Sequence, residues 1–408
     1  MTLRNPGWLA WAIVGFLGLC VISFPWLAGL RPAPLTARAH DEYRVTSAGD
    51  RGPGSLREAI VAGNRAPARF RILLPGRGIK VETPLPPLVN PAGVVVQGQD
   101  GSEIDGSALT EGAVLDVIAP GSSLRGFRLA GGGGPGILVR SPRVHVDGLA
   151  VEACGSGVHA LATAGGLAIA GSRFDRNGIG VMLEGGIRDA RVVDNVFHGQ
   201  RRAGVWAVSR EDAVATEVAI LRNRFEDDSL PIVAMNAGAR IEDNNLAGFQ
   251  EAGVFVSGRQ NVLRNNRVRA GHSYGICAVA SEATVIEGNE ADHNQAVGIL
   301  LKNALTTVVR GNRVYANGFG IVVVFGDPLR PSRVAENLLW RQAFDGVYII
   351  GGSPVVAGNQ VRASGGAGIR VDDFEGPGGV VRVAQPLLSD NVLDRNSPDA
   401  LKRGRYVE

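Results

Sequence analysis

Short runs of alternating apolar residues, each opened by a glycine, recur through the chain from about residue 130 onward. Ten of them read Gly-apolar-x-apolar, as in Gly180-Val-Met-Leu, and Pro231 opens one further run. The glycines are Gly136, Gly157, Gly180, Gly204, Gly253, Gly275, Gly298, Gly320, Gly346 and Gly368. Alternation with a period of two predicts strands in which the residue after each glycine points inward.

A second phrase, apolar-x-x-Asn-x-apolar, lies between these runs and repeats about every 22 residues. Its asparagines are Asn195, Asn223, Asn244, Asn265, Asn289, Asn312, Asn337, Asn359 and Asn391. Asparagine tolerates the left-handed turn conformation, so we expect each of them in a turn. Stacked asparagines can also hydrogen-bond from one repeat to the next.

Together the two phrases predict an all-β solenoid. No helical period separates the runs, which excludes crossover helices. Strands this short bury their apolar faces only when successive repeats stack in parallel register. Three strands in a repeat of about 22 residues predict a right-handed parallel β-helix of about 11 or more coils. Leucine-rich repeats lack their signature here, and a propeller needs about 40 residues per blade.

The segment before the regular repeats predicts an N-terminal cap and early, irregular coils. Ser55 and Glu58 form a capping-box pattern that opens a short helix. Short strands are expected at 70–74, 79–82 and 94–97. The predicted divisions are a leader with linker at 1–39, the cap and early coils at 40–129, regular coils at 130–395 and a solvated basic tail at 396–408.

The N-terminus predicts export. Residues 8–30 are apolar and nearly uncharged, which is long enough to span a bilayer, and Ala37-Arg38-Ala39 has the form of a cleavage site. We therefore expect one signal or transmembrane helix ahead of the solenoid. The protein is then periplasmic or at the extracellular face, and it is anchored to the inner membrane if the helix is uncleaved.

Composition narrows the class of protein. A hydrophobic content of 45% excludes a mainly disordered chain, and a net charge of +3 gives no reason to expect a nucleic-acid partner. No zinc spacing is present, and we predict neither a metal nor a cofactor. Cys154 and Cys277 lie five coils apart, or about 25 Å, so we predict free thiols.

The segment Ser47-Ala-Gly-Asp-Arg-Gly-Pro-Gly-Ser-Leu-Arg-Glu-Ala-Ile60, followed by these repeats, resembles the right-handed parallel β-helix superfamily. That group includes pectate lyases, mannuronan epimerases and carbohydrate-binding, sugar-hydrolysis repeat proteins. The resemblance covers roughly residues 43–395 and implies a polysaccharide partner. The Asp-Pro-His-Asp motif of mannuronan epimerases is absent, and no acidic cluster matches the calcium site of pectate lyases, so no catalytic residue is carried over.

The second and fourth residues after each glycine are expected to face outward, and many are apolar or aromatic. Such a surface indicates contact, either with a covering segment or protein partner or with a sugar polymer. Trp206 and Phe255 would stack on sugar rings. The polar substrate-binding candidates on the same face are Arg140, Glu184, Arg370 and Asp372.

Two classes of function stay open. A lyase or epimerase acting on a uronic-acid exopolysaccharide needs a base, a cation and a proton donor, for which Lys302, His272 and Tyr348 are the candidates. Hydrolysis by Glu184 and Asp372 is excluded because they lie many coils apart. The alternative is a non-catalytic carbohydrate-binding protein or a cell-surface scaffold or adhesin.

Overall fold

The computed structural model describes residues 41–209, 217–236, 238–397 and 401–407. The predicted signal or transmembrane helix at residues 8–30 lies outside these ranges. Within them, no helix is both long enough and apolar enough to cross a membrane.

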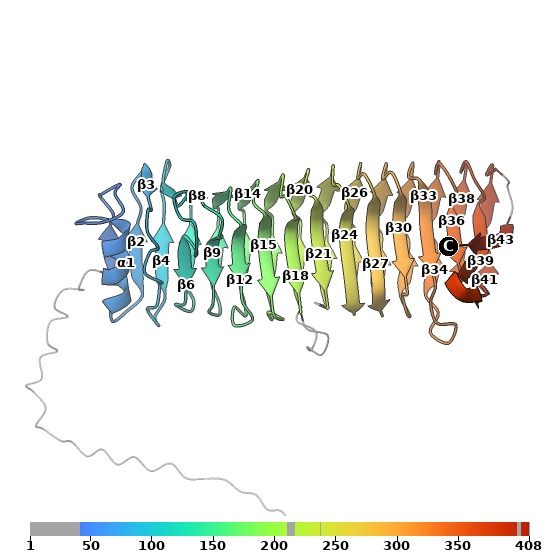
Figure 1. Cartoon of the computed structure of the whole chain (residues 1–408), viewed down its shortest axis with the longest axis horizontal. Helices are drawn as coiled ribbons and strands as arrows, with labels where there is room; N and C mark the ends of the chain where they lie inside the picture. Colours follow the sequence, from blue (N-terminus) through green and yellow to red (C-terminus); the bar gives the residue numbers. More distant parts are fainter. Residues whose placement is uncertain (1–40, 210–216, 237, 398–400, 408) are drawn as a thin grey trace, which may run out of the picture. The chain divides into compact units, whose positions relative to one another are not determined.

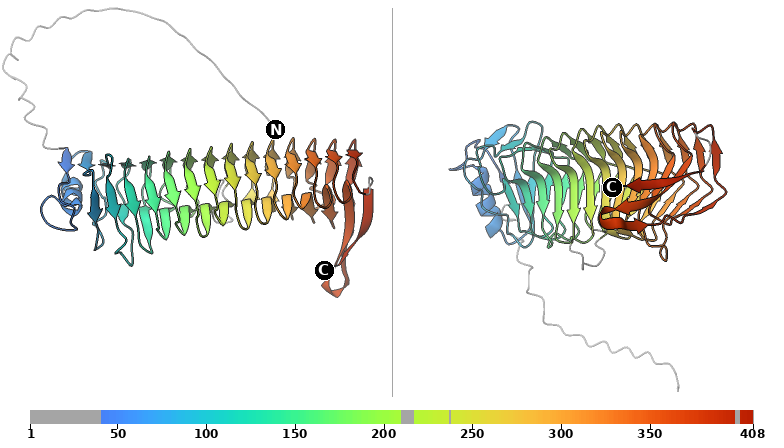
Figure 2. Two further views of the ribbon diagram at one scale, coloured as in Figure 1. Left: turned by 90° about the horizontal axis from the view of Figure 1, so that it is seen from above. Right: turned by 45° about the vertical axis from the view of Figure 1, so that its right-hand side comes forward.

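Three parallel sheets run along the axis of the solenoid, and each regular coil adds one strand to each sheet (Figures 1 and 2). Sheet A has 15 strands, from β1 (Glu42–Arg44) to β41 (Leu387–Ser389), and sheets B and C have 14 each. Neighbouring strands are parallel throughout except for the terminal hairpin of β39 (Ile369–Gly376) and β40 (Val380–Arg382). The predicted parallel β-helix is therefore confirmed.

Sheet B carries the candidate site, and all 14 of its strands are three residues long. Its strands are β3 (Gly78–Lys80), β5 (Glu103–Asp105), β8 (Arg128–Ala130), β11 (Ala150–Glu152), β14 (Arg173–Asp175), β17 (Val196–His198), β20 (Arg224–Glu226), β23 (Asn245–Ala247), β26 (Arg267–Arg269), β29 (Glu290–Asp292), β32 (Arg313–Tyr315), β35 (Leu338–Trp340), β38 (Gln360–Arg362) and β42 (Val392–Asp394). In the regular coils the middle residue is buried, so the first and third residues face outward.

The repeated glycines lie in sheet C, where they allow coils to pack closely. A Cβ at Gly180, in β15 (Ile179–Glu184), would lie 2.6 Å from both the Phe197 ring and the Gly204 carbonyl oxygen. Phe197 stacks between Phe174 and Phe225, with ring centroids 4.9 and 4.7 Å apart. The residue after each glycine is buried, as predicted.

Asparagines form a ladder in the two-residue turns between sheets A and B. The Asn223 Oδ1 accepts from the Asn195 backbone N–H at 2.9 Å, and the Asn223 Nδ2 donates to the Val192 carbonyl at 2.8 Å. The prediction that Asn265 belongs to this ladder is wrong, because Asn266 makes the equivalent hydrogen bonds in that coil. Asn265 precedes it with φ of 52°, which is the left-handed position that the prediction had given to the ladder residue.

The predicted helix forms at the N-terminal end of the solenoid as α1 (Leu56–Arg65) (Figure 1). The Ser55 Oγ accepts from the Glu58 backbone N–H at 3.3 Å, and the Glu58 carboxylate accepts from the Gly54 N–H at 2.7 Å. The early strands predicted nearby also form, as β2 (Phe70–Leu73), β3 and β4 (Val94–Gln97).

The basic C-terminal segment differs from its prediction as a solvated tail. Residues Leu401–Val407 form β43, which pairs in parallel with β39. Its side chains are exposed. The segment is therefore held by backbone pairing with the edge of β39 and not by burial of its side chains.

Cys154 and Cys277 are buried free thiols, which confirms their prediction. Burial raises the pKa of each thiol to about 12.

A second, less regular ladder follows the turns from sheet B to sheet C. Asn177 and Gln200 each donate a side-chain N–H to a carbonyl of the preceding coil, at 3.1 and 2.8 Å. Asp228 takes the equivalent place in the next coil, where its Oδ1 accepts from the Gln200 backbone N–H at 2.7 Å. Its Oδ2 is buried without a partner among the described residues. Burial raises the pKa of Asp228 to about 8.

We predict that Asp228→Asn stabilises the protein, and more so at pH 8 than at pH 5. An acid whose pKa is raised by folding loses stability as pH rises from its ordinary value of 3.8 to about 8, by up to about 1.4 kcal/mol per pH unit. Asparagine removes this loss and can donate to the preceding coil. Urea unfolding at both pH values measures the effect, and the reciprocal variant Asn177→Asp should gain the same pH dependence. An equal gain at pH 5 and pH 8 would contradict this account.

Neighbouring residues of β30 (Val297–Lys302) test which way the strand faces. Ile299 is fully buried in the core, whereas Leu300 is half-buried on the outer face. We expect Ile299→Ala to lower the free energy of unfolding by about 2–5 kcal/mol and Leu300→Ala by clearly less. Chemical denaturation of both variants checks this, and equal losses would mean that the outer face is buried as well.

Candidate functional site

A hollow of about 740 Å³ lies on the outer face of sheet B, between β17 and β32. Two columns of residues form it. One column consists of the third residues of the strands, and the other consists of the residues that follow them in the left-handed conformation. Arg267, the first residue of β26, also contributes. The lining residues are His198, Glu226, Asp227, Ala247, Gly248, Arg267, Arg269, Ala270, Asp292, His293 and Tyr315.

Small residues in the middle coils create the hollow. Ala247 lies in register between Glu226 and Arg269, and it offers only a methyl group where those residues have long side chains. Gly248 follows with φ of 73°, and a Cβ there would lie 2.3 Å from the Asp227 Oδ1. Glycine at this position is therefore favoured by the backbone conformation, and it leaves the Asp227 carboxylate in place.

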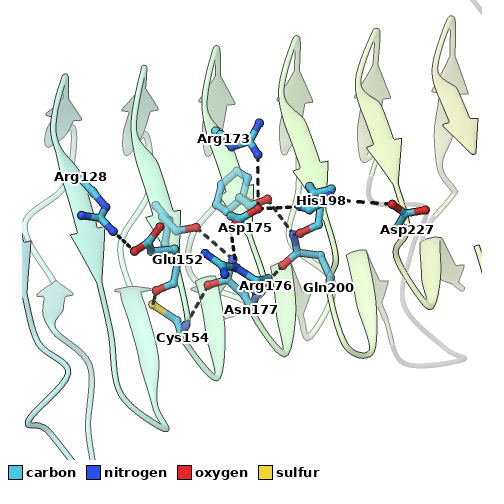
Figure 3. A network of polar contacts seen from close by, with 12 residues as sticks. Arg128, Glu152, Cys154, Arg173, Asp175, Arg176, Asn177, His198, Gln200 and Asp227 are labelled. Atoms are coloured by element: carbon cyan, nitrogen blue, oxygen red, sulfur yellow. Dashed lines mark hydrogen bonds and ion pairs between the residues drawn. The ribbon is translucent and has the colours of Figure 1, made fainter. Parts of the chain in front are cut away.

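The wall nearest β17 is built around His198. Its Nδ1 lies 2.7 Å from the Asp175 Oδ1, and its Nε2 lies 4.0 Å from the Asp227 Oδ2 (Figure 3). Asp175 also accepts from the Arg176 Nε at 2.7 Å. Burial works to raise the pKa of Asp175, but the hydrogen bonds from His198 and Arg176 outweigh it and hold that pKa below its usual value.

The opposite wall carries a second aspartate–histidine pair. The His293 Nδ1 lies 2.8 Å from the Asp292 Oδ2, and the imidazole is 63% exposed while Asp292 is 6% exposed. If Asp292 accepts the Nδ1 proton, the His293 Nε2 presents its lone pair to the hollow. Asp292 Oδ1 is buried and has no hydrogen-bond partner among the described residues.

Tyr315 and two arginines complete this wall. The Tyr315 ring stacks on Trp340 at 4.2 Å and meets the His293 ring edge-on at 5.9 Å. Its hydroxyl donates to the Glu290 Oε1 at 2.5 Å. Burial, and then this bond, raise the pKa of Tyr315 to about 12, so the phenol keeps its proton at neutral pH. Arg267 lies 3.8 Å from Glu290, whereas within the described ranges no carboxylate is within ion-pair distance of Arg269.

Three of the residues predicted from the sequence, Tyr348, Arg370 and Asp372, meet at the C-terminal end of sheet C. The Tyr348 hydroxyl donates to the Asp372 Oδ2 at 2.8 Å, and the Arg370 guanidinium donates to the same oxygen at 2.7 Å. Arg370 also lies over the Tyr348 ring, 4.8 Å from its centroid. Burial, and then the bond to Asp372, raise the pKa of Tyr348, which keeps its proton.

The other two catalytic candidates do not join Tyr348. Lys302 is exposed on the outer face of sheet C, two coils from Tyr348, or about 10 Å along the axis. His272 lies in the turn before β27 (Tyr274–Glu282), where its Nδ1 is 3.3 Å from the Phe249 carbonyl oxygen. Among the described residues, no hydrogen bond joins any two of these three side chains.

The remaining substrate-binding candidates are spread along sheet C. Glu184 pairs with the His159 Nε2 at 2.8 Å, and Arg140 pairs with Asp116 at 3.1 Å. Eight coil steps separate Glu184 from Asp372, or about 38 Å, which is far more than a hydrolytic pair allows.

The two aromatic candidates are half-buried on the outer face of sheet C. Trp206 lies 5.6 Å beneath the Arg202 guanidinium, and Phe255 lies in register between Val233 and Cys277. Farther along, apolar side chains on the same face cover one another in a cluster of Val297, Val322, Tyr348, Ile350 and Phe374. The aromatic character predicted for this face is therefore present, but much of it is occupied by side-chain packing.

The hollow on sheet B was not predicted from the sequence, because a groove was expected only over the strands that glycine marks, which form sheet C. The available signal was the run Asp292-His293 together with Tyr315 at the same place in the next coil. Among the residues that the structure describes, no group of three or more histidine, cysteine, aspartate or glutamate side chains is placed to hold a metal ion.

Comparisons with known proteins agree with the fold. The family model described as "Right handed beta helix region" matches residues 213–362. No curated protein matches the sequence.

Solved structures with a similar fold share little sequence with this chain. The A-module of the Azotobacter vinelandii mannuronan C-5 epimerase AlgE6 is 12% identical, with a TM-score of 0.52, over 86% of this chain and 98% of that one. An alginate lyase of family PL6 in complex with a trisaccharide is 12% identical, with a TM-score of 0.52, over 88% and 86%. The catalytic unit of a GH87 α-1,3-glucanase from Streptomyces thermodiastaticus is 14% identical, with a TM-score of 0.52, over 86% and 68%. The structure itself shows a parallel β-helix, and the family model supports the right-handed form over residues 213–362.

Proposed function

We propose that this protein binds an acidic polysaccharide in the hollow on sheet B and acts on it as a lyase or epimerase. The observation that carries the proposal is the grouping of an oriented imidazole, a protonated phenol and an unpaired guanidinium along one wall. These are the base, the proton donor and the cation that removal of a proton beside a sugar carboxylate requires.

Each group has a role that follows from its surroundings. His293 takes the proton from the carbon next to the carboxylate through its Nε2, while Asp292 holds the ring and stabilises the imidazolium. Arg269 pairs with the carboxylate as negative charge moves onto it. Tyr315 gives its proton either to the departing glycosidic oxygen, in a lyase, or back to the same carbon from the other side, in an epimerase.

The structural neighbours support the substrate class. The epimerase, the lyase and the glucanase with similar folds are named for work on alginate, mannuronan or glucan chains. We also infer export to the periplasm or cell surface, which the apolar run at residues 8–30 favours.

Binding without catalysis is the second candidate function. It is favoured by the exposure of His293, which leaves the base open to solvent before a ligand covers it. A carbohydrate-binding scaffold would use the same arginines and the Tyr315–Trp340 stack and would release no product.

A screen of the purified protein on uronic-acid polymers tests the proposal, with unsaturated ends read at 235 nm and C5 inversion read by NMR. We expect His293→Gln and Tyr315→Phe to lower kcat by about 100-fold or more, as loss of an acid or base does. Arg269→Gln should weaken substrate binding as well. Arg264→Gln, in the same coil but on sheet A, is the matched control and should change turnover less than threefold or so.

Three outcomes separate the alternatives. Turnover that survives His293→Gln but is lost in Lys302→Met would move the site to the outer face of sheet C. Polymer binding without turnover, weakened by Arg269→Gln, would favour the scaffold. No binding to any uronic-acid polymer would refute the proposal.

A further inference from the structure

The charges in the hollow do not match a pure polyanion. Its lining carries three carboxylates, Glu226, Asp227 and Asp292, against two guanidinium groups, Arg267 and Arg269. A site that recognises only repeated uronic acids would be expected to be positive along its length, because complementary charge favours binding. This hollow is mixed in charge.

Carboxylates lie on both sides of the small-residue gap, with Asp227 on one side and Asp292 on the other, where it is in register with Arg269. Asp227 is 71% exposed on one side, and its one charged partner among the described residues is His198 at 4.0 Å. Arg269 lies on the other side, two coils away, since Glu226, Ala247 and Arg269 follow one another in register. Two coil steps amount to about 10 Å, which separates the two charges by more than one sugar ring.

Asp292 adds an observation that is independent of charge counting. Its side chain is 6% exposed, and its Oδ1 has no hydrogen-bond partner among the described residues although it belongs to the wall of the hollow. A buried carboxylate oxygen without a donor is costly, so the fitting ligand brings a donor to it. A uronic-acid carboxylate cannot do this, and a sugar hydroxyl brings one donor but no charge. An ammonium group brings three N–H donors together with a positive charge, which makes the stronger hydrogen bond to a carboxylate.

We infer that the ligand of this hollow carries protonated amines as well as carboxylates, as in a polymer that alternates uronic acid with an unacetylated amino sugar. Arg269 holds the carboxylate, and Asp227 and Asp292 hold ammonium groups of amino sugars on either side of it. The inference rests on the proposed function and narrows its substrate class.

A matched pair of oligosaccharides tests the inference by calorimetry at pH 6. One alternates glucuronic acid with N-acetylglucosamine, and the other is the same chain after N-deacetylation. We expect the deacetylated chain to bind at least tenfold more tightly. Asp227→Asn and Asp292→Asn should each bring this ratio towards one, whereas Arg269→Gln should weaken binding of both chains.

The control is Asp243→Asn, an exposed aspartate in the left-handed turn before Asn244, where asparagine fits the backbone. It should leave the ratio unchanged, and circular dichroism checks the fold of every variant. Equal binding of the two chains, or a tenfold ratio that survives both aspartate variants, would overturn the inference. If polygalacturonate or alginate binds but the two matched oligosaccharides bind equally, the proposed function stands and the inference alone fails. If no uronic-acid polymer binds, both fail.

Discussion

Every coil of this solenoid must repeat the path of the coil before it, because the backbone N–H and C=O groups of its short strands find partners only in the adjacent coils. The inward positions then form continuous columns, such as the stacked rings of Phe174, Phe197 and Phe225. The asparagine ladder fixes the turn from sheet A to sheet B in the same way, coil by coil. Side chains that differ in chemical character from coil to coil are therefore found at the outward positions and in the turn that follows sheet B.

Much of the fold could be predicted from the sequence, because the interior columns repeat in it directly. The glycines of sheet C mark places where a Cβ would collide with a neighbouring ring or carbonyl, so they recur in coil after coil. The error at Asn265 shows where this reasoning stops. Asn265 and Asn266 are adjacent, and a shift of one residue decides which side chain points into the ladder.

The candidate site was harder to predict, for a physical reason. Strands of three residues are too short to show alternation, and four of the eleven residues that line the hollow are left-handed turn residues, such as Asp227 and His293. The coils also differ in length, with 28 residues from Asn195 to Asn223 and 21 from Asn223 to Asn244. The sequence alone therefore does not show which residues of neighbouring coils lie side by side. The outward positions of Tyr348, Arg370 and Asp372 could be predicted, because the glycine pattern marks the strands of sheet C. The hydrogen bonds among these three side chains could not be predicted from that pattern.

The gap at Ala247 and Gly248 also bears on how such a surface can evolve. One coil supplies both residues, and that coil contacts mainly the coil on either side. Duplication of this single coil would lengthen the hollow by one step of about 4.8 Å and leave both walls intact. Deletion of the coil would close the hollow. Gain or loss of one coil can therefore change the length of ligand that the hollow accepts. The groups that contact the ligand at either end need not change.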